Sequence, residues 1–182
     1  ETVYNTNGGS GSLDSSDFSL SISGGTATVS SATPTSLSAS GNVYTLGVGL
    51  TGTPDGSEVL SVVPVDDGIY DRSGNEASTT QSNNTATLND QLAPTISSVA
   101  LDSNNTTIAV TISEAVYNGL GGIGSLEASD FSLSISGGTA KVSSSTPTSI
   151  SASGNVYTLG IGLNGTPDGS EVLTAAPVDN AI

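Results

Sequence analysis

The chain has 182 residues, contains no cysteine, methionine, tryptophan or histidine, and carries a net charge of −15 because 17 acids face only two basic residues. The missing residue types exclude thiol chemistry, disulfides, Cys/His zinc sites and Ser–His or Cys–His nucleophile pairs. The scarcity of lysine and arginine argues against a nucleic-acid partner, which needs a basic surface, and against an anionic membrane surface. No apolar run is long enough to predict membrane insertion.

Such acidity has two interpretations. Charge repulsion can keep a protein soluble, or some of the acids can be neutralised by bound divalent cations, usually calcium, which prefers oxygen ligands. A cysteine-free, acidic and Ser/Thr-rich composition fits a bacterial extracellular setting.

The chain repeats itself with a period of 113 residues. Residues 1–69 align with residues 114–182 without a gap and are identical at 53 of 69 positions. This period fits a tandem array of sandwich-sized domains rather than a solenoid turn. The polar and then proline-containing stretch at 89–99 predicts a linker.

The repeat boundaries predict two domains. One spans 1–92 and lacks its first two strands, and the other spans 93–182 and lacks its last strand or strands. Two explanations stay open. The chain is a segment of a longer polymer, or strands are shared between neighbouring repeats.

Alternating apolar and polar residues predict strands throughout, and no stretch has the 3.6-residue period of a helix. In chain order, we expect strands near 18–22, 26–31, 36–40, 42–50, 57–65, 95–101 and 106–113. The glycine pair at 24–25 predicts a hairpin turn between the first two. About seven short strands per repeat predict an all-β fold of antiparallel two-sheet sandwiches.

The candidate metal ligands centre on the acidic loop 66–78, DDGIYDRSGNEAS. Glu114 continues the inward phase of the strand at 106–113, where a carboxylate needs a hydrogen-bonding partner or a cation. The predicted calcium ligands are Glu1, Asp66, Asp67, Asp71, Asn75, Asp90, Asp102, Glu114 and Asp179, with Asn180 in the second-copy place of Asp67.

The alternative for Asp71 and Asn75 is a turn capped by its own side chains, because the loop lacks the spacing of an EF-hand. Asp14 and Asp17 are expected to cap a turn that enters a strand. The segment 53–58, TPDGSE, predicts a Pro-Asp-Gly turn with no assigned function. No catalytic site is expected, because no histidine is present and no aromatic residue accompanies the paired acids.

Four segments resemble one known family. They are ISEAVYN at 112–118, LEASDFSLSISGG at 126–138, NVYTLGIGL at 155–163 and IYDRSGN at 69–75. They resemble the bacterial Ig-like tandem repeats of S-layer proteins and giant cell-surface adhesins. The resemblance implies a non-catalytic Ig-like sandwich that serves as spacer, stalk or adhesive repeat, with calcium at domain ends and linkers.

We therefore expect a structural or adhesive segment of a long bacterial extracellular surface protein. Its partners would be neighbouring repeats, further copies of itself and an unknown surface ligand. The alternatives are a subunit of a self-assembling filament or S-layer with strands shared between repeats, and a polysaccharide-binding module.

Overall fold

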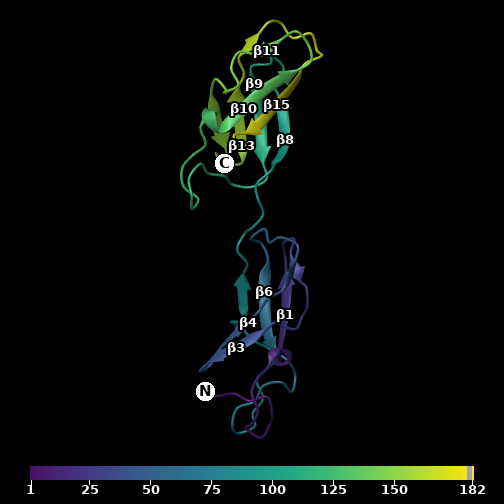
Figure 1. Cartoon of the computed structure of the whole chain (residues 1–182), viewed down its shortest axis with the longest axis vertical. Helices are drawn as coiled ribbons and strands as arrows, with labels where there is room; N and C mark the ends of the chain where they lie inside the picture. Colours follow the sequence, from purple (N-terminus) through teal and green to yellow (C-terminus); the bar gives the residue numbers. More distant parts are fainter. Residues whose placement is uncertain (180–181) are drawn as a thin grey trace. The chain divides into compact units, whose positions relative to one another are not determined.

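The computed structural model describes residues 1–179 and 182, and the fold is all-β (Figure 1). The helical elements in this part of the chain are two short 3-10 turns, η1 (Ser15–Asp17) and η2 (Ala128–Asp130). None of the described helices is long and apolar enough to cross a membrane. The chain divides into two compact units, Glu1–Leu92 and Ala93–Ile182.

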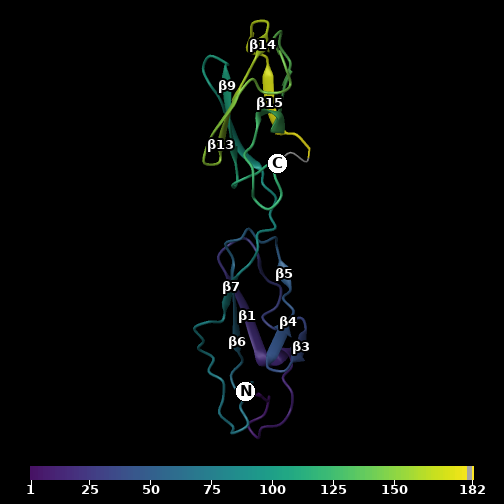
Figure 2. The same cartoon turned by 90° about the vertical axis from the view of Figure 1, so that its left-hand side faces the viewer.

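The first unit is built from three small antiparallel sheets. Their strand orders are β1-β6-β7, β3-β4 and β2-β5. Phe18 of β1 and Tyr44 of β4 bring two of the sheets together, with ring centroids 6.2 Å apart. Figure 2 shows these two sheets as separate layers. The strands are β1 (Phe18–Ser23), β2 (Thr28–Val29), β3 (Leu37–Ser40), β4 (Val43–Leu46), β5 (Leu50–Thr51), β6 (Val59–Pro64) and β7 (Thr85–Thr87).

The second unit repeats this plan and adds two strands at its start. Its sheets have the orders β12-β13-β9-β8, β10-β15 and β11-β14. The strands are β8 (Ile96–Leu101), β9 (Thr107–Ile112), β10 (Phe131–Ser136), β11 (Lys141–Val142), β12 (Ile150–Ser153), β13 (Val156–Gly160), β14 (Leu163–Asn164) and β15 (Val172–Pro177).

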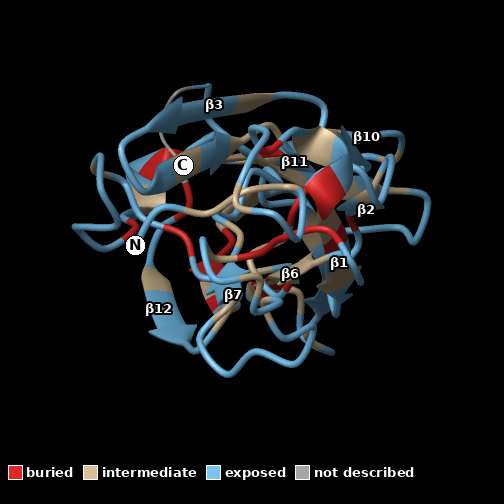
Figure 3. Ribbon diagram, turned by 90° about the horizontal axis from the view of Figure 1, so that it is seen from below, coloured by how far each residue is buried: buried red, intermediate tan, exposed pale blue. Residues whose placement is uncertain are grey.

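The core of the second unit lies between its two larger sheets. Ile108, Val110 and Ile112 of β9 are at most 3% exposed, so the predicted inward phase of this strand is confirmed. They pack in one cluster with Phe131 and Leu133 of β10. The outer strands β3 and β12 are mostly exposed (Figure 3).

The predicted hairpin at Gly24–Gly25 is wrong. β1 pairs with β6 from Phe18↔Pro64 to Ser23↔Val59, whereas β2 pairs with β5. Both glycines have positive φ, as a tight turn requires, but they carry the chain from one sheet to another. The Glu58 carboxylate lies directly against Gly25. A Cβ at this position would be 2.2 Å from the carboxylate, so only glycine fits there.

The two units differ in which strand edges are covered. In the second unit β9 pairs along one edge of β13, and there Leu159 is 0% and Tyr157 7% exposed. In the first unit the equivalent strand β4 has only β3 as a neighbour, and Leu46 and Tyr44 are half-buried. The opposite holds on the other side, because β7 pairs with β6, whereas the equivalent strand β15 pairs, among the described strands, with β10 alone.

This difference predicts unequal costs for one substitution made in both copies. Leu159→Ala should lower the free energy of unfolding of its unit by about 2–5 kcal/mol, because it leaves a cavity in a closed core. Leu46→Ala should cost about 1 kcal/mol, because the half-buried side chain loses less packing. Urea unfolding followed by resolved NMR signals of each unit measures both. Equal losses would contradict the difference in burial.

Candidate functional site

The acidic loop 66–78 lies at one end of the first unit, against the N-terminal segment. Tyr4 and Tyr70 exchange two main-chain hydrogen bonds of 2.8 Å. The Ala77 amide bonds the Ile69 carbonyl oxygen at 2.8 Å, which closes the loop. Ile69 is 6% and Tyr70 8% exposed, so these two side chains are buried at the centre of a loop that is otherwise rich in acids.

Asp71 holds the tip of this loop as a turn. Its Oδ1 accepts hydrogen bonds from the amides of Ser73 and Asn75, both at 2.8 Å, and its Oδ2 accepts one from Asn75 Nδ2 at 2.7 Å. The bonds from the Asn75 side chain and main chain lower the pKa of Asp71. Both carboxylate oxygens therefore satisfy main-chain and side-chain donors of their own turn, as in the self-capped alternative.

Asp67 and Glu76 form the second hydrogen-bonded group of the loop. Glu76 Oε1 accepts the Asp67 amide at 2.6 Å, which supports the left-handed φ of 58° at Asp67. The Tyr70 hydroxyl donates to Asp67 Oδ1 at 2.8 Å. This bond, together with burial and the charges of Asp67, Glu76 and Asp66, raises the pKa of Tyr70 to about 12. Asp66 and Glu76 also line a small hollow with Ala77, Ser78 and Thr79.

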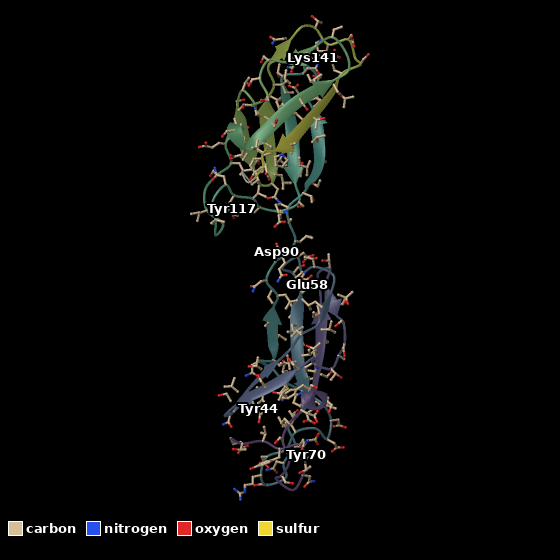
Figure 4. The ribbon with its side chains drawn as sticks, in the orientation of Figure 1. Tyr44, Glu58, Tyr70, Asp90, Tyr117 and Lys141 are labelled. Carbon is tan, nitrogen blue, oxygen red and sulfur yellow. The ribbon has the colours of Figure 1, made fainter. Side chains whose placement is uncertain are left out.

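The remaining predicted ligands lie elsewhere. Asp90 lies at the other end of the first unit from Tyr70, near Glu58 (Figure 4), and its Oδ1 accepts the Leu92 amide at 2.8 Å. Asp102 lies in the second unit and caps the β8–β9 turn through Thr106 and Thr107. Burial raises the pKa of Asp102, but these hydrogen bonds outweigh it and the pKa is lowered.

The structure places the strand-end acids at exposed or partly exposed positions. Glu1 and Asp179 are exposed, and Glu114 is half-buried in the bend that follows β9. Asn180 lies outside the described residues. Within residues 1–179 and 182, no group of three or more acidic side chains is arranged to hold a metal ion.

A buried glutamate that the sequence did not single out forms the most completely bonded carboxylate of the first unit. Glu58 is 0% exposed and directly precedes β6. It accepts hydrogen bonds from the amides of Thr26 and Ala27 at 2.8 and 2.9 Å, and from those of Asp55 and Gly56 at 3.0 and 3.1 Å. We call the carboxylate together with these four amides the glutamate cradle.

The second unit contains the same cradle around Glu171. The amides of Thr139, Ala140, Asp168 and Gly169 donate to it at 2.9 to 3.0 Å. Gly138 faces this carboxylate as Gly25 faces Glu58, and each has a positive φ. Both cradles form where the segments SGGTA and TPDGSE meet, and both segments occur in each copy. Their contact could not be predicted because each segment on its own indicates only a turn.

Hydrogen bonds from the amides keep the glutamate carboxylate of each cradle ionised. The bond from the Ala27 amide is the largest cause that lowers the pKa of Glu58 to about 2, against the opposing effect of burial. The bond from the Ala140 amide does the same for Glu171, whose pKa is also about 2. Amides that surround an anion in this way form an anion site, and here the protein's own carboxylate occupies it.

The second acidic pair behaves as predicted. Asp14 caps η1 by accepting the Ser16 amide at 2.7 Å, and its own amide donates to Asp17 Oδ2 at 2.8 Å. Glu127 and Asp130 form the equivalent capping box at η2. The prediction that Asp14 and Asp17 cap a turn entering a strand is confirmed.

Comparisons of the chain with protein-family models, with curated proteins and with solved structures found no match. The chemistry of the site must therefore be judged from its own geometry. Asp67, Asp71, Asp102, Glu58 and Glu171 all accept hydrogen bonds from main-chain amides or neighbouring side chains that hold a turn or a strand end.

Glu58→Gln should destabilise the first unit, because a glutamine amide group places its own donors against the Asp55 and Gly56 amides. The wild-type contribution is fully present above the ordinary glutamate pKa of about 4.5 and is lost as the pH falls through the folded-state pKa of about 2. The variant should therefore lose stability at pH 7 and show a flatter pH dependence between these values.

Urea unfolding of both proteins from pH 7 to pH 2 measures this difference, and Asp66→Asn, a change at an exposed acid, is the control. If Glu58→Gln has the stability and pH profile of the control, the cradle does not stabilise the unit.

Proposed function

We propose that this chain is a structural repeat segment of a bacterial extracellular surface protein, built from Ig-like β-sandwich repeats that act as a stalk or spacer. The observation that carries the proposal is the duplicated glutamate cradle. The same carboxylate, the same four amides and the same glycine recur at Glu58 and Glu171. A repeated device that holds strands together supports a mechanical role for the repeat.

The arrangement of the sheets supports the Ig-like interpretation. Phe131 and Tyr157 come from two different sheets, and their ring centroids lie 5.8 Å apart inside the core. The corresponding pair Phe18 and Tyr44 lies 6.2 Å apart in the first unit. Facing antiparallel sheets with alternating inward side chains are the arrangement of a sandwich.

The charge of the chain supports an extracellular spacer. With a net charge of −15, neighbouring molecules repel one another and resist association through non-specific contacts. Tyr117, 45% exposed, is the most exposed of the five tyrosines. This leaves little aromatic surface for the stacking on which sugar recognition depends, so the spacer role is favoured over a polysaccharide-binding role.

A stalk must keep its fold under tension, and this can be measured by stretching the chain between its ends in an atomic force microscope. We expect two unfolding peaks, each releasing about 300 Å of chain, since a unit of about 90 residues extends by about 3.5 Å per residue. Glu58→Gln should lower the force of one peak and leave the other unchanged. Extension without resolved peaks would contradict a load-carrying role.

Calcium binding is a second and separate proposal, and Asp66 and Glu76 support it because they line one hollow with the hydroxyl-bearing Ser78 and Thr79. Two carboxylates with neutral oxygens and water would form a weak site of the kind found in extracellular modules. The melting temperature in 10 mM calcium should exceed that in EDTA by about 3 °C.

Asp66→Asn should remove this difference, while Asp14→Asn, which changes an acid at η1, should retain it. An equal melting temperature in calcium and in EDTA would contradict the calcium proposal and leave the spacer proposal intact.

A further inference from the structure

The two units show which strand occupies each open edge, because they share nearly the same sequence but differ in their neighbours. β13 in the second unit has β9 beside it, and the equivalent β4 in the first unit has an open edge. β6 in the first unit has β7 beside it, and no described strand lies along the corresponding edge of the equivalent β15 in the second unit, so that edge is open. Each unit is therefore a template for the missing neighbour of the other.

We propose that these open edges are docking sites for a second copy of the segment 70–113, supplied by a neighbouring repeat. Its residues 70–92 would dock on the second unit, and its residues 93–113 on the first. This proposal deepens the proposed function, on which it rests for the tandem arrangement, by naming the partner of the repeat.

The register on β4 follows from the second unit. β13 and β9 pair through Tyr157↔Val110 and Leu159↔Ile108. The Ile112 amide bonds the Asn155 oxygen at 2.9 Å, and the Ile161 amide bonds the Thr106 oxygen at 2.8 Å. With the offset of 113, Tyr44 would pair with Val110 of the docked copy and Leu46 with its Ile108.

Side-chain burial supports the same register. Phe131 is 1% and Leu159 0% exposed where β9 is present. Phe18 and Leu46, the equivalent residues, are half-buried where no such strand is present. Val43 is 67% exposed, whereas its equivalent Val156 is 36% exposed. A docked Ile108 and Val110 would bring apolar side chains to the place where the first unit lacks them.

The open edge of β15 has corresponding features. In the first unit the Val62 amide bonds the Asn84 oxygen at 2.9 Å, and the Leu88 amide bonds the Glu58 oxygen at 3.0 Å. Without such a partner, Val172 is 62% exposed, whereas its equivalent Val59 is half-buried. A Cβ on Gly56 would lie 3.1 Å from Asp90, but one on Gly169 would meet open space.

The loop after β9 supplies a third contact for the same segment. Tyr4 pairs with Tyr70 in the first unit, and its equivalent in the second unit is Tyr117, which is 45% exposed. Leu120 and Ile123 beside it are 97% and 66% exposed, in place of Asn7 and Ser10 in the first copy. The docked Tyr70 would therefore pair with Tyr117 next to an apolar loop tip.

Two synthetic peptides test the proposal on the full chain, with amide hydrogen exchange measured by NMR. Peptide 104–113 should slow exchange at the amides of Tyr44 and Leu46 by about tenfold or more, because they face the open edge. The Thr45 amide, which faces β3, should change little. Peptide 70–92 should instead slow exchange at Leu173 and Ala175, and spare Thr174.

A matched pair of modified peptides controls for non-specific binding. Methylation of the main-chain nitrogen of Val110 removes a donor that points at β4 and should abolish protection. Methylation at Ala109, whose amide faces away from β4, should preserve it.

Absence of protection, protection at the wrong unit, or equal binding of the two methylated peptides would overturn the proposal. The force peaks of the whole chain are measured without peptide, so failure here is distinguishable from failure of the spacer role.

Discussion

One carboxylate, buried at Glu58 in the first unit and half-buried at Glu171 in the second, ties together the elements of each unit that meet at one end. Glu58 directly precedes β6, while its amide donors directly precede β2 or follow β5. The β2-β5 sheet is thereby fixed to the β1-β6-β7 sheet. The same carboxylate explains the glycine pair, since only a residue without a side chain can approach it at Gly25. Loss of this charge would release three chain segments at once.

The shortage of basic residues explains why amides neutralise the acids. With one lysine and one arginine against 17 acids, ion pairs cannot satisfy the carboxylates. Turns rich in Gly, Ser, Thr and Asn present free amides and hydroxyls at short range, and Asp71 and Asp102 use them as Glu58 does. Glu58, Asp71 and Asp102 therefore contribute to folding by defining turns, and their lowered pKa values mean that the fold stabilises the ionised form of each.

Local patterns could be predicted from the sequence, whereas contacts between distant segments could not. The period-two alternation predicted the inward residues of β9, and Asp14 with Asp17 predicted the capped turn, because both depend on neighbours a few residues away. Gly24–Gly25 was misassigned as a hairpin because a tight turn has the same glycine signal whichever sheet the chain enters next. Glu58 was missed because its partners at 26–27 are about thirty residues away in sequence.

Comparing the two units shows which part of a residue's burial depends on its local sequence and which part depends on the neighbouring strand. Leu46 and Leu159 lie in the same local sequence, VYTLG, but only the second is fully buried. The local sequence cannot account for this difference, so it must come from β9. The segment 70–113 contributes β7 to the first unit and β8 and β9 to the second, so both units use strands from this one segment. In the proposed docking, each unit gains its closed core from another copy of the segment 70–113, so stability and assembly would depend on the same hydrogen bonds.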